Sequence, residues 1–461
     1  MALAFVQVMD RLRCWRADAL LRRVFRNAGV LLSGHAAAGL FSLANLAIAA
    51  RALGPESFGM LVLIHTYALT AAELCGFESW QTFVHFSAHR ARTNWRTATQ
   101  LLFKFTSALD LGAALVGTLV AVLVAPLVAV WMNWDHDTTR LVMLYSLVIP
   151  FTLNATPSGV LRLFNRFDLL AKHVTLRSAA RLLASLTAWS LDCSFHGFLA
   201  AWFCSEIGGQ LILLWMGWRE FARQGLLHGM GWSLREVSQV HDGLWRFIRA
   251  NKLHSTVMLV RGPLTLLLVG GVLGASAAAL YRVAKGFAVV LNRPTELLTN
   301  SIYPDLSQLI ANRDWRAARR LVVRASLLAG AVVTLLAILF AALGKPLLVL
   351  TAGSAYVAAY PVLLLLVLAA TVEAFSAALD PTLYALGRPG VAARINTCLI
   401  LIYAPLLVLA LNAYNLAGAG YAMLGYAVAA TLVMAIAAAW FLSPGRLSRA
   451  QLASVEVTLE V

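Results

Sequence analysis

Long apolar runs separated by short, basic segments dominate this sequence. A transmembrane helix needs about 20 mostly apolar residues, and runs of that length exceed the strands of a membrane barrel. The pattern therefore predicts an all-α integral membrane protein with about 12 transmembrane helices. We expect the spans at about 27–50, 57–80, 100–130, 139–160, 175–195, 197–218, 247–271, 276–297, 321–343, 356–380, 395–412 and 415–443.

Composition excludes the main soluble classes of protein. Of the 461 residues, 60% are hydrophobic and only 13% are charged, against roughly 25% charged residues in soluble domains. The mean hydropathy is +0.76, whereas a disordered chain would be polar. The five cysteines are scattered without a CxxC pair or a Cys/His cluster, so we expect neither a disulfide framework nor a metal, and no cofactor.

The net charge of +16 is distributed unevenly. Thirty of the 37 Lys and Arg residues fall in the N-terminus, the C-terminal tail and alternate loops, including five in the segment 161–181. By the positive-inside rule both termini are cytoplasmic. Basic residues beside spans indicate membrane lipid headgroups, rather than nucleic acid, as the partner. The opposite loops hold Arg51, Arg140, Arg282 and Lys345, and the spans hold Lys104, Arg261 and Lys285.

The sequence repeats itself at an offset of 220 to 222 residues. Leu53-Gly54 matches Leu273-Gly274, Trp95-Arg96 matches Trp315-Arg316, and Arg166 matches Arg388. Because each half has an even number of spans, the halves are parallel repeats, which we expect to form two bundles around a central cavity. The predicted parts are a basic amphipathic segment 1–26, a first bundle 27–218, a cytoplasmic interfacial linker 219–246, a second bundle 247–443 and a cytoplasmic tail 444–461.

Three stretches carry a family resemblance. Residues 50–59 read Ala-Arg-Ala-Leu-Gly-Pro-Glu-Ser-Phe-Gly, residues 159–167 follow the fourth span, and residues 297–307 follow the eighth. They resemble the bacterial O-antigen and exopolysaccharide flippases of the multidrug/oligosaccharidyl-lipid/polysaccharide exporter superfamily. Family members often carry an acid beside the basic residue of the seventh span. Here Val260 precedes Arg261, so a carboxylate partner must come from elsewhere.

The resemblance implies a function and a location. It implies alternating-access flipping of an undecaprenyl-pyrophosphate-linked oligosaccharide from the cytoplasmic to the periplasmic leaflet of the bacterial inner membrane, for surface polysaccharide biosynthesis. A polysaccharide polymerase and glycosyltransferases are the expected partners. The chain has no GxxxxGK[ST] motif, so we expect a transporter rather than an ATP-hydrolysing enzyme, driven by an H⁺ or Na⁺ gradient, the membrane potential or the substrate gradient.

Buried cations indicate an anionic ligand. A charge inside a span costs about 2.5–3.5 kcal/mol on insertion scales. Arg261 lies mid-span before a Gly262-Pro263 pair, and Lys285 lies in the eighth span with Arg282 nearly one turn away. They read as a cationic wall that receives a diphosphate, or alternatively as partners in internal salt bridges. Arg51 reads as an aid to product exit or, preferably, as an anchor to lipid headgroups.

Four acids, Glu73, Asp110, Glu206 and Glu373, are predicted at mid-membrane, where they either couple ions or pair with the buried cations. Three of them lie in the first half, so we expect the two halves to carry opposite charge and to attract across an empty cavity. A cation-coupled multidrug exporter of the same superfamily is the alternative function. A membrane enzyme is disfavoured because the outer loops are short.

Overall fold

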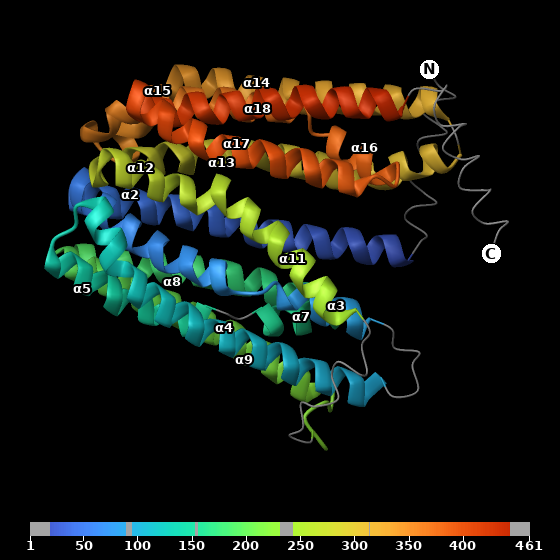
Figure 1. Ribbon diagram of the computed structural model, residues 1–461, viewed down its shortest axis with the longest axis horizontal. Coiled ribbons are helices and arrows are strands. Elements are labelled where there is room, and N and C mark those ends of the chain that lie inside the picture. Colours follow the sequence, from blue (N-terminus) through green and yellow to red (C-terminus); the bar gives the residue numbers. More distant parts are fainter. Residues whose placement is uncertain (1–18, 89–94, 153–154, 231–242, 313, 443–461) are drawn as a thin grey trace. The chain divides into compact units, whose positions relative to one another are not determined.

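The computed structural model describes residues 19–88, 95–152, 155–230, 243–312 and 314–442 (Figure 1). Within these residues the regular structure is helical, as predicted. The elements are α2 (Ala19–Cys75), α3 (Ser79–Ser87), α4 (Trp95–Met132), α5 (His136–Tyr145), η1 (Ser146–Val148), α6 (Ile149–Thr152), α7 (Ala155–Leu163), α8 (Phe167–Ser190), α9 (Phe195–Arg223), α11 (Leu244–Leu259), η2 (Val260–Leu264), α12 (Thr265–Leu273), α13 (Ala275–Ala311), α14 (Trp315–Thr351), η3 (Ser354–Ala359), α15 (Tyr360–Phe375), α16 (Leu379–Ala385), α17 (Pro389–Tyr414) and α18 (Leu416–Phe441).

The helices follow the predicted crossings. Among the described residues, nine helical stretches are long and apolar enough to span a membrane. The first of them, Gly29–Ser87, contains two predicted spans, which meet at a kink where Gly54 leaves helical geometry and Pro55 follows it. The predicted fifth and eighth spans are α8 and α13, which are 24 and 37 residues long but carry charged residues that lower their hydropathy. The described helices thus account for all twelve predicted crossings.

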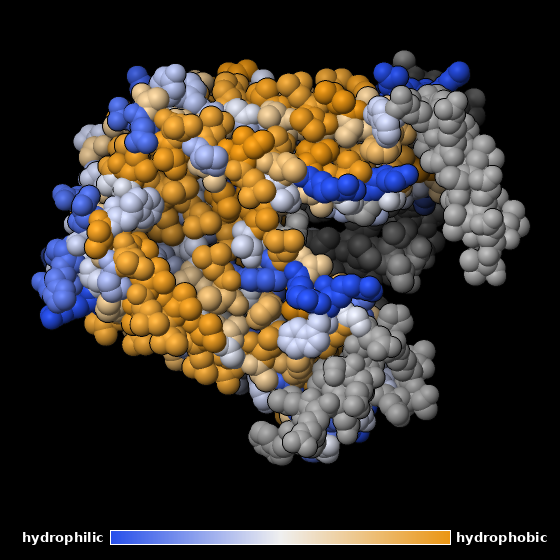
Figure 2. All heavy atoms as spheres, viewed as in Figure 1, coloured by the Kyte–Doolittle hydropathy of each residue, from blue (hydrophilic) through white to orange (hydrophobic). Residues whose placement is uncertain are grey.

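The surface of α4 shows the consequence of a lipid environment. Leucines recur at every fourth position along one face, and each is more than half exposed: Leu111, Leu115, Leu119, Leu123 and Leu127. Side chains four residues apart lie above one another on a helix, so they form a continuous apolar stripe. Apolar side chains also cover most of the face drawn in Figure 2. Contact of such a surface with lipid acyl chains is favourable, whereas its contact with water is unfavourable.

The chain divides into two compact units. Unit 1 comprises residues 1–52, 67–130 and 134–255, and unit 2 comprises 53–66, 131–133 and 256–461. The predicted tail 444–461, and most of the predicted segment 1–26, lie outside the described residues, as does 231–242 of the predicted linker. The proposed domain boundaries therefore stay predictions.

The repeat is visible in the backbone. Gly54 and Gly274 both have a positive φ, 70° and 88°, where each half turns from its first to its second crossing. Trp95 and Trp315 both begin the long third helix of their half. Asn165 and Gly387, offset by 222 residues, both adopt a positive φ just before the fifth crossing of their own half. These conformations suit glycine and asparagine, which explains why the matched positions hold those residues.

Each unit has its own packed core. In unit 1, aromatic and aliphatic side chains from α3, α4, α7 and α9 form one cluster, with Phe103 stacked on Phe221 at 4.1 Å between ring centroids. In unit 2, Ile302, Leu306 and Val322 pack between α13 and α14. Small residues permit close approach of neighbouring helices: a Cβ added at Gly420 of α18 would lie 2.5 Å from Leu365 of α15.

Candidate functional site

The seventh crossing is broken in the middle, as the Gly262-Pro263 pair predicts. α11 and α12 are joined by a π-helical turn, η2, in which Gly262 leaves helical geometry (φ −94°, ψ −110°). Pro263 has no backbone N–H to donate, and its ring clashes with the carbonyl one turn earlier in the helix. The regular helical hydrogen bonding therefore cannot continue through it. The hydroxyl of Thr265 donates to the carbonyl of Val260 at 2.9 Å and satisfies part of the opened backbone.

Arg261, the first candidate, lies inside this break. Its guanidinium forms an ion pair with Glu373 of α15 and stacks over the ring of Tyr426 of α18, 4.5 Å from the centroid. Glu373 therefore supplies the carboxylate that position 260 lacks. Neither side chain is sealed, since 28% of Arg261 and 23% of Glu373 is exposed. The break thus presents a paired but accessible guanidinium.

Lys285 approaches the same break from α13. Its ammonium donates to the carbonyl of Gly262 at 3.1 Å and lies 5.7 Å from the ring centroid of Tyr281. Arg282 lies three residues earlier on α13. The carbonyl of Gly262 is available because the helix is broken there, so the break itself positions the lysine. We call Arg261, Lys285 and Glu373 the unit-2 cluster.

Tyrosines surround the unit-2 cluster. Tyr403 of α17 lies 3.2 Å from the Thr265 hydroxyl, and its ring meets Tyr426 edge-on at 5.8 Å. The Tyr426 hydroxyl donates to the side-chain carbonyl of Asn396 at 3.4 Å. Tyr403 and Tyr426 lie in long apolar spans, and no spacing signal in the sequence distinguishes them from ordinary core residues.

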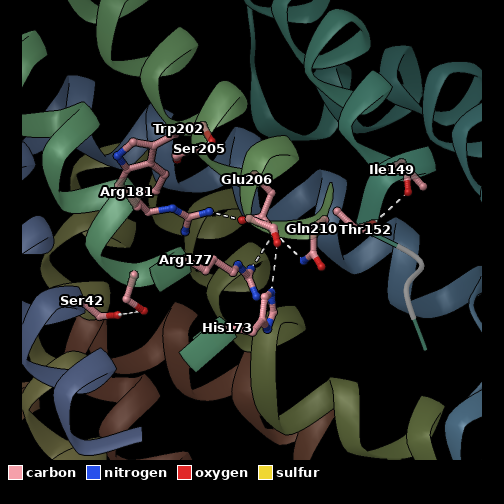
Figure 3. Close-up of polar contacts among 12 residues, drawn as sticks. Ser42, Ile149, Thr152, His173, Arg177, Arg181, Trp202, Ser205, Glu206 and Gln210 are labelled. Atoms are coloured by element: carbon pink, nitrogen blue, oxygen red, sulfur yellow. Dashed lines mark hydrogen bonds and ion pairs between the residues drawn. The ribbon is translucent and has the colours of Figure 1, made fainter. Parts of the chain in front are cut away.

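A second charged cluster lies in unit 1, between α8 and α9 (Figure 3). Glu206 of α9 is completely buried and forms ion pairs with Arg177, at 2.6 Å, and with Arg181, both from α8. The side-chain amide of Gln210 donates to the same carboxylate at 2.9 Å. We call Arg177, Arg181 and Glu206 the unit-1 cluster.

Arg177 and Arg181 fall both in the basic segment 161–181, which the sequence argument counts as cytoplasmic, and in the predicted fifth span 175–195. The structure places both inside α8, which begins at Phe167. Their spacing of four residues, extended backwards by His173, places two arginines and a histidine on one helix face, which is the signal that sequence reasoning overlooked.

The other acids have separate surroundings. Asp110 of α4 is buried and accepts hydrogen bonds from the backbone N–H of Thr156, at 3.0 Å, and from its hydroxyl, at 2.8 Å. It therefore caps the first turn of α7, where an anion is favoured. Glu73 has an exposed side chain near the end of α2, and Lys252 donates to its backbone carbonyl at 2.8 Å. Arg51 is exposed on α2, three residues before Gly54.

The structure unites some candidates and separates others. Arg261, Lys285 and Glu373 come together, whereas Glu73, Asp110 and Glu206 lie at three distinct places in unit 1. We expected acids of the first half to attract cations of the second. For two of the acids this is wrong, because Glu206 and Glu373 each pair with arginine of their own unit. Within the residues that the structure describes, no group of His, Cys, Asp and Glu could hold a metal ion.

The chain is similar in sequence to one known inner membrane protein. No protein-family model matches the chain. It is 29% identical over 348 residues to the inner membrane protein YghQ of Escherichia coli strain K12, which covers 75% of this chain and 97% of that protein.

Solved structures agree on the fold. An inward-facing multidrug resistance MATE family transporter of the MOP superfamily matches with a TM-score of 0.70 and 14% identity, over 88% of this chain and 94% of its own. The lipid II flippase MurJ in an inward closed conformation matches with a TM-score of 0.65 and 12% identity, over 88% and 87%. The chain is an integral membrane protein with the fold of the MOP-superfamily transporters.

Proposed function

We propose that this protein is a flippase that moves an undecaprenyl-pyrophosphate-linked oligosaccharide from the cytoplasmic to the periplasmic leaflet by alternating access. The carrying observation is the unit-2 cluster, in which Arg261 and Lys285 meet at a helix break with Glu373 as the carboxylate beside them. A lipid diphosphate is a lipid headgroup whose charge and oxygen acceptors fit such a site. The likeness in fold to a lipid II flippase supports this class of substrate.

The chemistry of the cluster suits a diphosphate. An arginine presents two parallel N–H donors to phosphate oxygens, and a lysine adds a compact charge. Both cations lie in predicted spans, where an uncompensated charge costs about 2.5–3.5 kcal/mol. An arriving diphosphate competes with Glu373 for Arg261 because both partners remain partly exposed. Without ligand, Glu373 therefore neutralises Arg261. When the diphosphate binds, it replaces Glu373 as the partner of Arg261.

The break gives binding a mechanical consequence. Arg261 is carried by the π-helical turn, and Lys285 bonds to the carbonyl of Gly262 in that turn. A ligand that binds both cations therefore pulls on η2, the non-helical part of the seventh crossing. Differential binding to two shapes of this segment is what alternating access requires, because a ligand shifts a conformational equilibrium only by its difference in affinity.

Other parts of the proposal extend the sequence argument. The inner-membrane location is supported by the name of the relative YghQ, and the orientation with both termini cytoplasmic by the distribution of Lys and Arg. Asp110 and Glu73 stay candidates for H⁺ or Na⁺ coupling. The polymerase and glycosyltransferases stay the proposed partners in surface polysaccharide synthesis.

Proteoliposomes test the proposal. The purified full chain is reconstituted with a fluorescent undecaprenyl-diphosphate oligosaccharide, and a membrane-impermeant quencher reports how fast the lipid changes leaflet. We expect R261A to lower the initial rate at least about tenfold, equivalent to 1.4 kcal/mol. The control is R320A, since Arg320 is an exposed arginine near the start of α14 in the same unit. Equal rates for R261A and the unmodified protein at equal incorporation would overturn the proposal.

The similarity in fold to a multidrug transporter supports one alternative function, the export of organic cations. A cation-coupled exporter of organic cations is expected to present acidic and aromatic groups to its ligand. The unit-2 cluster does contain one acid and neighbouring tyrosines, but its two cations, Arg261 and Lys285, outnumber the single carboxylate of Glu373. In the same proteoliposomes we expect no uptake of a cationic dye on imposing an H⁺ or Na⁺ gradient. Dye transport that R261A leaves intact would establish the alternative function.

A further inference from the structure

The unit-1 cluster has more positive than negative charge. Arg177 and Arg181 lie one turn apart on α8, and both guanidinium groups converge on the carboxylate of Glu206. Figure 3 shows them approaching that carboxylate from the same helix. The two arginines and one glutamate therefore leave one positive charge in excess, in a helix that we treat as membrane-spanning.

The carboxylate of Glu206 is fully engaged. Its Oε1 accepts from Arg177 at 2.6 Å and from Gln210 at 2.9 Å, while its Oε2 accepts from Arg181. Because three donors from two helices hold it and none of its surface is exposed, the carboxylate is fixed in place. This geometry favours Glu206 as a permanent counter-ion and disfavours it as a carrier of protons or Na⁺.

The arginines extend beyond this buried acid. The side chain of Arg177 is 34% exposed and that of Arg181 is 18% exposed, against 0% for Glu206. Each guanidinium has five N–H donors in a planar fork, more than one carboxylate accepts. The cluster thus has a buried acidic end and an accessible cationic end, which is the polarity expected of an anion site.

The surroundings hold both guanidinium groups in place. Gly209 of α9 makes room for Arg177, since a Cβ there would lie 2.7 Å from Cγ of the arginine. The Trp202 ring lies 5.2 Å from the Arg181 guanidinium, and its N–H donates to the Ser185 hydroxyl at 3.2 Å. Because both guanidinium groups are already ordered, they lose little conformational entropy when a ligand binds. This preorganisation favours the affinity of the site.

We infer that Arg177 and Arg181 form a second anion site, which binds a phosphate group while Glu206 competes with it from the buried side. The inference deepens the proposed function and rests on it for the source of the phosphate, a lipid diphosphate. The phosphate offsets the excess positive charge of the cluster and accepts from the exposed part of the Arg177 guanidinium. His173, which contacts the carbonyl of Gly209 at 3.1 Å, lies one turn before Arg177 on the same face of α8.

Binding measurements on the full chain in lipid nanodiscs test the site. The probes are inorganic diphosphate and farnesyl diphosphate, and the Kd is measured by calorimetry in an R261A background, which disables the unit-2 cluster. We expect R177Q/R181Q to weaken binding at least about tenfold, and E206Q to strengthen it about tenfold because the competing charge is gone. The matched control is R219Q, because Arg219 on α9 also lies over a tryptophan, Trp215 at 4.9 Å, but away from Glu206.

The sign of the E206Q effect separates a binding site from a purely structural ion pair. A purely structural cluster loses stability in E206Q and gains no affinity, so unchanged or weaker binding there overturns the inference. If E206Q does not purify in a folded form, R181K decides instead. It keeps the charge but loses the planar fork, so binding weakens about fivefold or more. Equal binding by R181K and the background protein overturns the inference.

The two probes distinguish the source of the phosphate. Tighter binding of farnesyl diphosphate than of inorganic diphosphate, removed by R177Q/R181Q, supports a lipid headgroup. Equal binding of both probes, also removed by R177Q/R181Q, supports a site for the phosphate alone. Because these measurements involve no transport, loss of flipping with intact anion binding counts against the proposed function and not against this site.

Discussion

The two charged clusters contain the same kinds of group and differ in how they are held. In unit 1 the acid is buried and saturated, between two continuous helices, α8 and α9. In unit 2 the acid is partly exposed, and its arginine lies in a broken helix. A buried, fully bonded ion pair resists exchange, whereas an accessible pair at a break exchanges its partner more easily. We therefore expect the unit-1 cluster to be a fixed site and the unit-2 cluster to be a moving one.

Deleting each acid gives the largest expected contrast. E206A leaves two arginines around a buried gap, and we expect the free energy of unfolding to fall by about 3–5 kcal/mol. E373A removes a partner that solvent or headgroups replace, so we expect a loss of about 1 kcal/mol. Unfolding in mixed micelles, followed by circular dichroism, measures both values. Equal losses would remove the distinction between the clusters.

The helix break is present in only one of the clusters and can be tested next. P263A restores a backbone N–H in the seventh crossing, and we expect it to favour a regular helix and to slow flipping about tenfold. The rate is measured in proteoliposomes at equal incorporation. P346A is the control, because Pro346 also lies inside a helix of unit 2, α14, but without a non-helical residue. A normal rate in P263A would show that the break does not move during transport.

Two adjacent glycines test how tightly the unit-1 cluster is packed. A Cβ at Gly209 would overlap Arg177, while a Cβ at Gly208 would meet nothing within 4 Å. We expect G209A to cost about 1 kcal/mol, since a flexible side chain can move aside. G208A should be neutral or stabilising by up to about 1 kcal/mol, because alanine is the better helix former. Thermal unfolding monitored by size-exclusion fluorescence compares them, and a harmless G209A would indicate a loose site.

The smallest expected effect concerns the ring under Arg261. Y426L removes the aromatic face, and the cation–π contribution of about 0.5–2 kcal/mol predicts a several-fold lower affinity for a lipid diphosphate. Y426F keeps the ring and loses the hydroxyl, which bonds to Asn396 at 3.4 Å and also interacts with Arg261, so we expect a smaller change than in Y426L, about 0.5 kcal/mol or roughly twofold. Calorimetry with farnesyl diphosphate ranks the two variants, and the reverse order would exclude the stacking contribution.

Much of the fold was predictable because membrane helices are encoded locally. Each crossing requires its own apolar run, and the kinks at Gly54, Gly262-Pro263 and Gly274 require residues that tolerate or impose them. The fifth predicted span, 175–195, overlaps the single helix α8, which extends back to Phe167 and carries both Arg177 and Arg181. The break at Arg261 was predictable for the same local reason.

The sequence by itself determined the number of crossings, the repeat, the break in the seventh crossing and the presence of cations in the second half. These properties depend on residues that are neighbours along the chain. Only the tertiary structure decided which acid meets which cation, because Arg261 and Glu373 are 112 residues apart, and Arg177 and Glu206 are 29 apart. Such pairings depend on which helix faces meet, and the Coulomb energy that stabilises them acts only after the packing has brought the charges together.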